Sequence, residues 1–132
     1  MDKPFFDTNI LLYLLSSDSR ADQAETLIAD GGVISVQVLN EFASVASRKL
    51  KMDWSEIQDI LTTIKTICRV VPITLEIHES GIAIAEKYKL SFYDSLILAA
   101  ASHSECRIVY SEDMQDGQRI KNITIQNPFK RL

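Results

Sequence analysis

Short apolar segments alternate along the chain with longer stretches in which apolar residues recur at helical spacing, and this alternation most limits the possible folds. The segments at residues 4–6, 33–36, 69–73 and 108–111 have the composition of buried strands, and residues 123–125 form a shorter fifth candidate. Strands that alternate with helices are typical of an α/β sandwich. We therefore expect a mainly parallel central sheet of four or five strands, flanked by helices.

Helical patterns fill the intervals between these strands. The expected helices cover about residues 9–15, 21–28, 38–46, 53–67, 77–90 and 91–101. Asp53 and Glu56, at the start of one of them, have the spacing of a capping box. Because connections between parallel strands are right-handed, the carboxyl ends of the strands should lie at the same edge of the sheet. In α/β proteins, ligands bind in a crevice at that edge.

Length, charge and cysteine content limit the kinds of protein that this chain can be. The 132 residues suit one compact domain, and the formal net charge of −4 argues against a strongly basic nucleic-acid-binding module. An acid excess still suits an enzyme that acts on nucleic acid, if the acids cluster at a metal site. No apolar stretch is long enough to span a membrane, and the N-terminus lacks an export signal. Cys68 and Cys106 stand alone, as buried thiols do in a reducing compartment, so we expect a cytoplasmic protein.

Acidic residues follow the predicted strands at several points. Asp7 comes directly after the first strand, and Glu112 and Asp113 come after the fourth. Glu41 lies on the helix after the second strand, within the apolar stripe that should face the sheet. Asp94 stands near the start of a very apolar helix whose first turn should point to the same edge. Carboxylates from distant segments are therefore predicted to meet in one crevice.

Each of these acids also has a structural explanation. Asp7 has the position of a helix N-cap, and Asp94 stands three residues after Ser91, as the acid of a capping box does. Asp113 lies in a polar segment that suits a turn. Glu41 is the hardest to explain in this way, because an ionised carboxylate on an apolar helix face is costly without a partner. The combination of all four favours a functional site over four separate structural roles.

A cluster of carboxylates repels itself unless something neutralises it. Two unit charges 4 Å apart repel by about 4 kcal/mol at an effective dielectric constant of 20. Either some of the carboxylates bind protons, or a cation lies among them. Carboxylate oxygens suit hard divalent ions such as Mg²⁺ or Mn²⁺. A metal site of this kind with open coordination positions suits the hydrolysis of phosphodiesters.

Four short motifs, taken in order, resemble the PIN-domain nucleases, and most of all the VapC-type toxins of bacterial toxin–antitoxin pairs. The motifs are Asp7-Thr8-Asn9, Asn40-Glu41, Tyr93-Asp94-Ser95-Leu96-Ile97 and Ser111-Glu112-Asp113-Met114. Their order and spacing match across nearly the whole chain. The resemblance implies a PIN-like three-layer sandwich in which residues 1–132 form a single PIN domain.

The same resemblance implies a ribonuclease site that depends on Mg²⁺ or Mn²⁺. The residues that match the catalytic, metal-binding acids of the family are Asp7, Glu41, Asp94 and Asp113, and Asp116 resembles a further metal-binding acid. Thr8 or Asn9 would orient Asp7 or a metal-bound water. The protein would then be an endoribonuclease that hydrolyses RNA, as the toxin of a type II toxin–antitoxin system. A homodimer and a cognate antitoxin that covers the acidic groove are also expected.

Basic residues are needed to hold an RNA backbone, since the site itself is negative. The candidates are Arg48, Lys49, Lys51, Arg119 and Lys121, and solvated surface charge is the alternative for each. Tyr93 is expected to pack beside its apolar helix rather than to stack on a base.

Other classes of protein share parts of this pattern of acids. A housekeeping PIN nuclease without a toxin role would have the same site, and so would a non-catalytic domain whose acids hold a metal or a basic partner. A phosphoaccepting receiver domain is disfavoured, because it carries two acids after its first strand and only Asp7 is present here. A haloacid-dehalogenase-like phosphatase needs an aspartate two residues later, where this chain has Asn9.

Overall fold

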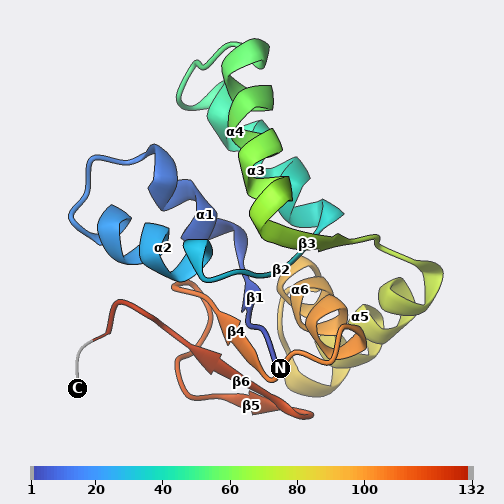
Figure 1. The fold of residues 1–132 in the computed structure, drawn as a ribbon. Helices are drawn as coiled ribbons and strands as arrows, with labels where there is room; N and C mark the ends of the chain where they lie inside the picture. The colour runs from blue at the N-terminus through green and yellow to red at the C-terminus, as the bar shows by residue number, and fades with distance from the viewer. Residues whose placement is uncertain (1, 131–132) are drawn as a thin grey trace.

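The strands form one sheet in the computed structural model, which describes residues 2–130 (Figure 1). In order along the chain they are β1 (Phe5–Phe6), β2 (Gly32–Ser35), β3 (Cys68–Val71), β4 (Ile108–Tyr110), β5 (Arg119–Ile120) and β6 (Ile123–Gln126). Within residues 2–130 the sheet has six strands in the order β3-β2-β1-β4-β6-β5. Only β5 runs antiparallel to its neighbour there, so the expected mainly parallel sheet is confirmed.

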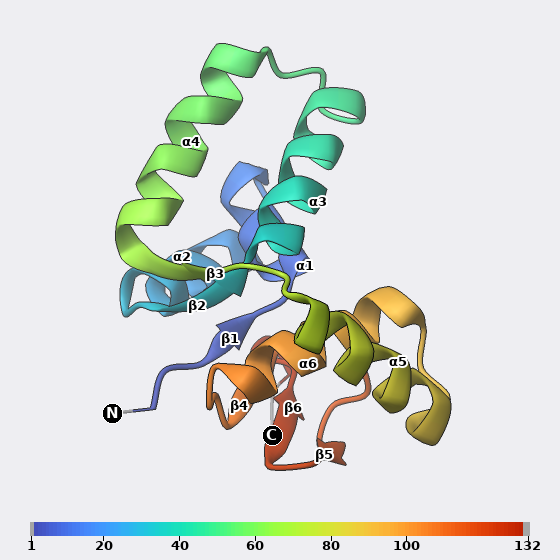
Figure 2. The ribbon, with the colours of Figure 1, turned by 90° about the vertical axis from the view of Figure 1, so that its right-hand side faces the viewer.

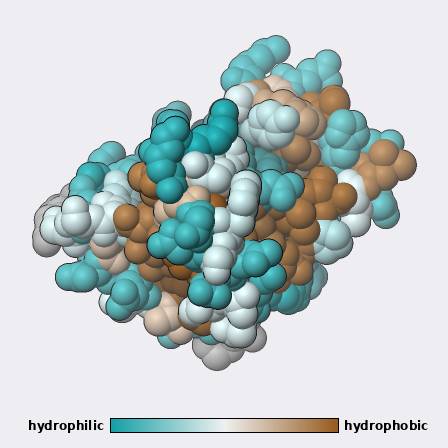
Figure 3. All heavy atoms as spheres, turned by 90° about the horizontal axis from the view of Figure 1, so that it is seen from above, coloured by the Kyte–Doolittle hydropathy of each residue, from teal (hydrophilic) through white to brown (hydrophobic). Residues whose placement is uncertain are grey.

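Helices cover both faces of this sheet. They are α1 (Thr8–Leu12), the 3₁₀ helix η1 (Tyr13–Leu15), α2 (Arg20–Ala29), α3 (Val36–Arg48), α4 (Trp54–Ile67), α5 (Leu75–Tyr88) and α6 (Phe92–His103). In Figure 1, α1 and α2 lie on one side of the sheet and α5 and α6 on the other. The pair α3 and α4 projects beyond the sheet in both views (Figures 1 and 2). Figure 3 views the molecule from that projecting end, where hydrophilic and hydrophobic side chains are interspersed.

The sequence patterns locate the elements well but differ from the structure in two places. The helix expected over residues 9–15 divides into α1 and η1. Among residues 2–130 the sheet has six strands, whereas at most five were expected. The additional strand is β5, whose two residues are too few to produce a visible pattern. The capping box of Asp53 and Glu56 is confirmed, with hydrogen bonds of 2.8 and 3.1 Å.

The core lies on both sides of β1. Phe5 and Phe6 are both fully buried, as expected for a central parallel strand that is covered on each face. Helix α6 is buried over residues 95–101 and packs closely on α5. A Cβ atom added to Gly81 of α5 would lie 2.8 Å from Leu96 Cδ2 of α6, so the glycine permits this approach. No helix among residues 2–130 combines the length and apolar character that a membrane crossing needs.

The order of the strands places a crevice beside β1. The chain moves from β1 outward to β2 and β3, then returns to the other side of β1 to form β4. Where the strand order reverses in this way, the connections leave the sheet in opposite directions and open a crevice at the carboxyl edge. The backbone N–H of Asp7 donates to Tyr110 O at 3.0 Å, so the ends of β1 and β4 lie side by side at that point.

Candidate functional site

A pocket of about 320 Å³ lies at this carboxyl edge, between α1, α3, the start of α6 and the loop after β4. Its lining includes all four acids that the sequence singled out, namely Asp7, Glu41, Asp94 and Asp113. The lining also includes Thr8 and Asn9 from the first motif. Residues that are far apart in the chain are thus brought to one place, as the predicted topology requires.

Asp7 is both the N-cap of α1 and a wall of the pocket. Its Oδ1 accepts a 2.7 Å hydrogen bond from the Thr8 backbone N–H, and its Oδ2 accepts a 2.8 Å bond from Ser111 Oγ. The side chain is buried, and burial is the main cause that raises the pKa of Asp7 from its usual 3.8 to about 6. The bonds from Ser111 and Thr8 oppose this change, whereas the negative charges of Asp94 and Asp113 add to it.

Asn9 connects two of the acids. Its Nδ2 donates to Asp7 Oδ2 at 3.2 Å and to Asp113 Oδ2 at 3.1 Å. Its Oδ1 accepts a 3.1 Å hydrogen bond from the Glu112 backbone N–H. Every hydrogen-bonding atom of the Asn9 amide group therefore has a partner around the pocket, and the residue orients the acids on each side of it.

Glu41 is held in place by hydrogen bonds. Thr8 Oγ1 donates to Glu41 Oε1 at 2.5 Å, and Gln37 Nε2 lies 3.4 Å from Glu41 Oε2. Gln37 also donates to the Tyr93 carbonyl oxygen at 3.2 Å, which joins α3 to the start of α6. These donors explain how an acid is tolerated on the inward side of α3. The sequence reasoning missed Gln37, although its position one helical turn before Glu41 was a usable signal.

Asp94 is placed by the start of α6. The Ser91 hydroxyl accepts a 3.2 Å hydrogen bond from the Asp94 backbone N–H and so caps the helix. Partial burial raises the pKa of Asp94, and the negative charges of Asp113 and Glu41 raise it further. Ser91 thus caps the helix while the Asp94 carboxylate lines the pocket, so the structural and functional explanations are compatible.

Asp116 does not line the pocket. Its Oδ1 accepts a 2.7 Å hydrogen bond from the Asn127 backbone N–H, and its Oδ2 lies 3.8 Å from Lys130 Nζ. The side chain thus joins the loop after β4 to the C-terminal segment. Its role as a further metal-binding acid stays a prediction that this geometry does not favour.

The five basic candidates separate into different regions. Arg48 lines the pocket from the last turn of α3, and Lys49 and Lys51 follow it in the exposed link to α4. Arg119 and Lys121 lie on the β5–β6 hairpin and do not line the pocket. Tyr93 also lines the pocket and is 62% exposed, so the expectation that it packs beside its helix is wrong.

The donor chemistry of the pocket suits a hard divalent cation, although the acids do not yet form a ligand cluster. Carboxylate oxygens are the donors that Mg²⁺ and Mn²⁺ prefer. Among residues 2–130, no three aspartate, glutamate, histidine or cysteine side chains stand in an arrangement that could hold a metal ion. The amide of Asn9 lies between Asp7 and Asp113 instead. A cation held by both Asp7 and Asp113 would take the place of the Asn9 amide as their shared partner.

The comparison with protein families decides the identity of the fold. The model of the PIN domain matches residues 5–119. The chain belongs to the PIN domain family. The resemblance carried by the four motifs is thereby confirmed, and the α/β sandwich described above is a PIN fold.

Several solved structures contain chains similar to this PIN domain. A toxin–antitoxin complex from Klebsiella pneumoniae is 26% identical, with a TM-score of 0.75 over 97% of this chain and 99% of the other. The sarcin–ricin loop cleaving toxin VapC20 from Mycobacterium tuberculosis is 21% identical, with a TM-score of 0.69 over 83% and 89%. VapBC2 from Rickettsia felis, bound to a promoter DNA fragment, is 19% identical, with a TM-score of 0.67 over 93% and 96%. No curated protein matches this PIN domain in sequence.

Proposed function

We propose that this PIN domain is a divalent-metal-dependent endoribonuclease, with RNA as its substrate and Mg²⁺ or Mn²⁺ as its cofactor. The observation that carries the proposal is the position of buried Asp7 in a pocket lined by three further acids. Burial resists the ionisation of Asp7, and a bound cation favours it, so the site gains from a cation. The acids proposed to bind the metal and act in catalysis are Asp7, Glu41, Asp94 and Asp113.

The cation would supply the Lewis acidity that lowers the pKa of the attacking water and offsets charge on the scissile phosphate. The protein supplies the positions of the acids. Ser111 and Asn9 orient Asp7 through hydrogen bonds to its Oδ2. Thr8 holds Glu41 on the opposite wall, where its carboxylate would serve as a metal ligand or orient the attacking water.

Groups at the mouth of the pocket suit the rest of an RNA strand. Arg48 places a guanidinium group beside the acids and would bind a backbone phosphate. Lys49 and Lys51 extend this basic region along the exposed link. The exposed ring of Tyr93 presents a surface on which an unpaired base could stack.

We further propose that the protein is the toxin of a toxin–antitoxin pair. The similar chains in the Klebsiella and Rickettsia structures are described as parts of toxin–antitoxin or VapBC assemblies, and VapC20 as a sarcin–ricin loop cleaving toxin. An acid-lined pocket on a chain of net charge −4 would attract a basic segment of a cognate antitoxin. We expect the protein to act in the cytoplasm as a homodimer of single-domain chains.

Cleavage of RNA by purified protein tests the enzymatic part of the proposal. Single-stranded and structured RNA should be cut with Mg²⁺ or Mn²⁺ and left intact with EDTA. Asp94→Asn should abolish cleavage, whereas Asp59→Asn, an exposed acid on α4, should cut like the wild type. Cleavage by Asp94→Asn at the wild-type rate, from a preparation free of contaminating nuclease, would rule out this site.

Induced expression tests the toxin role separately. A toxin should arrest growth, and co-expression of the small gene beside it should relieve the arrest. An active, well-folded enzyme without any effect on growth would be a housekeeping nuclease instead.

A further inference from the structure

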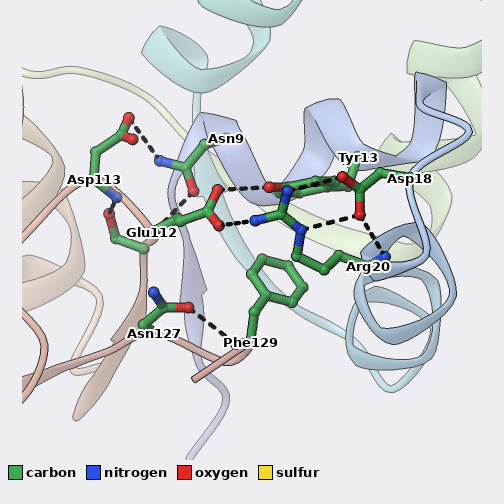
Figure 4. A network of polar contacts seen from close by, with 9 residues as sticks. Asn9, Tyr13, Asp18, Arg20, Glu112, Asp113, Asn127 and Phe129 are labelled. Atoms are coloured by element: carbon green, nitrogen blue, oxygen red, sulfur yellow. Dashed lines mark hydrogen bonds and ion pairs between the residues drawn. The ribbon is translucent and has the colours of Figure 1, made fainter. Parts of the chain in front are cut away.

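The two adjacent acids after β4 point in different directions (Figure 4). Asp113 faces Asn9, with 3.1 Å between Asp113 Oδ2 and Asn9 Nδ2, and lines the pocket. Glu112 faces Tyr13 of η1 and Arg20 of α2 and does not line the pocket. The family resemblance assigns only Asp113 to the site, and the geometry raises the question of what Glu112 does.

Both carboxylate oxygens of Glu112 have partners. Tyr13 OH donates to Oε1 at 2.7 Å, and Arg20 Nη1 donates to Oε2 at 2.7 Å. The side chain of Glu112 is 25% exposed and that of Arg20 42%, so the two hydrogen bonds, more than burial, fix the position of Glu112. Glu112 could reach a metal in the pocket only by breaking both contacts.

The partners of Glu112 are themselves fixed. The Arg20 guanidinium lies 5.0 Å from the centre of the Tyr13 ring and also binds Asp18, with an Nη2–Oδ2 distance of 2.8 Å. The ring of Phe129 packs edge-on against Tyr13, with 4.8 Å between the ring centres. Segments before α2 and at the C-terminal end therefore hold the Tyr13 and Arg20 side chains that bind Glu112 (Figure 4).

The backbone of Glu112 contacts Asn9, which lines the pocket. The Glu112 N–H donates to Asn9 Oδ1 at 3.1 Å. Because this donor requires the oxygen of the Asn9 amide to face it, the nitrogen of the same amide is turned toward Asp7 and Asp113. A shift of Glu112 would therefore release the Asn9 amide and, with it, the shared contact of the two acids.

We propose that Glu112 is a positioning residue, which through Asn9 and Asp113 fixes the acidic wall of the pocket. The effect of Glu112 on metal binding rests on the proposed function, because it requires that the pocket binds a metal. Residues that orient metal ligands typically change metal affinity by 10- to 100-fold when they are replaced. Loss of the Glu112 contacts should therefore weaken Mn²⁺ binding by about tenfold.

The first measurement uses the metal-free protein and does not depend on whether the protein is a metal-dependent nuclease. The side-chain amide signals of Asn9 in ¹H–¹⁵N spectra can be assigned by their absence in Asn9→Ala. Glu112→Ala keeps the backbone N–H that donates to Asn9 Oδ1 but removes the side-chain contacts that hold it in place, so these signals should shift and broaden. Glu79→Ala is the matched control, since it makes the same change at an exposed acid of α5 that does not line the pocket.

The second measurement is the affinity for Mn²⁺ by calorimetry, with the unfolding of each metal-free variant recorded beside it. Glu112→Ala and Arg20→Ala should each bind about tenfold more weakly, and the double variant no more weakly than either one, because they interrupt the same chain of contacts. Glu112→Gln, which keeps an acceptor for Tyr13, should recover part of the loss.

The outcomes separate this inference from the proposed function. Unchanged Asn9 signals in Glu112→Ala would overturn the positioning role of Glu112, whatever the affinity of the variant for Mn²⁺. Wild-type affinity for Mn²⁺ in a folded Glu112→Ala variant would also overturn it and leave the proposed metal site standing. A wild-type protein that binds no Mn²⁺, but whose Asn9 signals respond to Glu112→Ala, would support the positioning role and refute the metal site.

Discussion

The Thr8 hydroxyl donates a 2.5 Å hydrogen bond to Glu41 Oε1 across the pocket. The bond joins the first turn of α1 to the inward face of α3, two elements that are separated by η1, α2 and β2 in the chain. Thr8 is buried, and its hydroxyl is one of the donors that make a carboxylate tolerable at position 41. The residue after Asp7 therefore helps to set the opposite wall of the pocket.

Replacement of Thr8 by valine, which has nearly the same shape, should lower the rate of RNA cleavage by about tenfold, as loss of a group that orients a ligand typically does. Glu41 loses its shortest hydrogen bond and is free to turn toward solvent. Thr8→Ser keeps the hydroxyl and should retain most of the activity. Equal activity of both variants under single-turnover conditions would show that the bond is not needed.

Asp7 should make the metal-free protein less stable as the pH rises from about 4 to 7. Burial raises the pKa of Asp7 to about 6, so the folded protein holds this proton more tightly than the unfolded chain does. The contribution of the protonated Asp7 is fully present below pH 3.8 and is lost as the pH rises through about 6. Relative to Asp7→Asn, the wild type should lose roughly 3 kcal/mol of unfolding free energy, at about 1.4 kcal/mol for each pKa unit.

Urea unfolding of both proteins in EDTA over this pH range measures the effect. The comparison with Asp7→Asn removes the contributions of all other titrating groups. If the two curves of unfolding free energy against pH run parallel, Asp7 is already ionised at low pH and the effect of its burial is small.

A divalent cation should stabilise the folded protein at neutral pH, because it binds the folded pocket and not the unfolded chain. At a concentration 100 times its dissociation constant the gain is about 2.7 kcal/mol. Asp113→Asn should abolish most of this gain, whereas Asp116→Asn should retain it, since Asp116 contacts Asn127 instead of the pocket. Thermal unfolding with and without Mn²⁺ measures both, and an equal loss in the two variants would place Asp116 among the ligands.

Arg48 should account for one phosphate contact in RNA binding. Each such contact contributes about 0.7 to the slope of log affinity against log salt concentration for a single strand. Arg48→Ala should reduce the slope by about that amount, and Lys65→Ala, on the exposed side of α4, should leave it unchanged. Measurement on Asp94→Asn protein avoids cleavage of the RNA, and an unchanged slope for Arg48→Ala would exclude the contact.

Hydrophobic periodicity was sufficient to predict most of the fold. The strand of Phe5 and Phe6 and the apolar helix after Asp94 have strong local patterns, because their side chains are buried on more than one side. β5 has no such pattern, since it consists of Arg119 and Ile120 and depends on pairing with β6. Local pattern therefore predicts buried elements, whereas an edge strand is determined by its neighbour.

The acids of the site could be predicted from topology, but the groups that orient them could not. Strand ends identify Asp7 and Asp113, because parallel strands bring their carboxyl ends together. The roles of Ser111 and Gln37 depend on hydrogen bonds to residues that are distant in the chain. Tyr93 was expected to pack because its helix is apolar, yet at its position in the first turn the side chain is 62% exposed.

The first strand occupies the middle of the sheet and the loop after β4 completes the pocket, and this arrangement has a consequence for protein synthesis. A ribosome delivers Asp7, Glu41 and Asp94 while β4 and Asp113, which follows it, are still to be translated. β1 meanwhile lacks its neighbour on one side, so the acidic wall is incomplete. The proposed ribonuclease is therefore expected to stay inactive, also toward the message that encodes it, until residue 113 has left the ribosome.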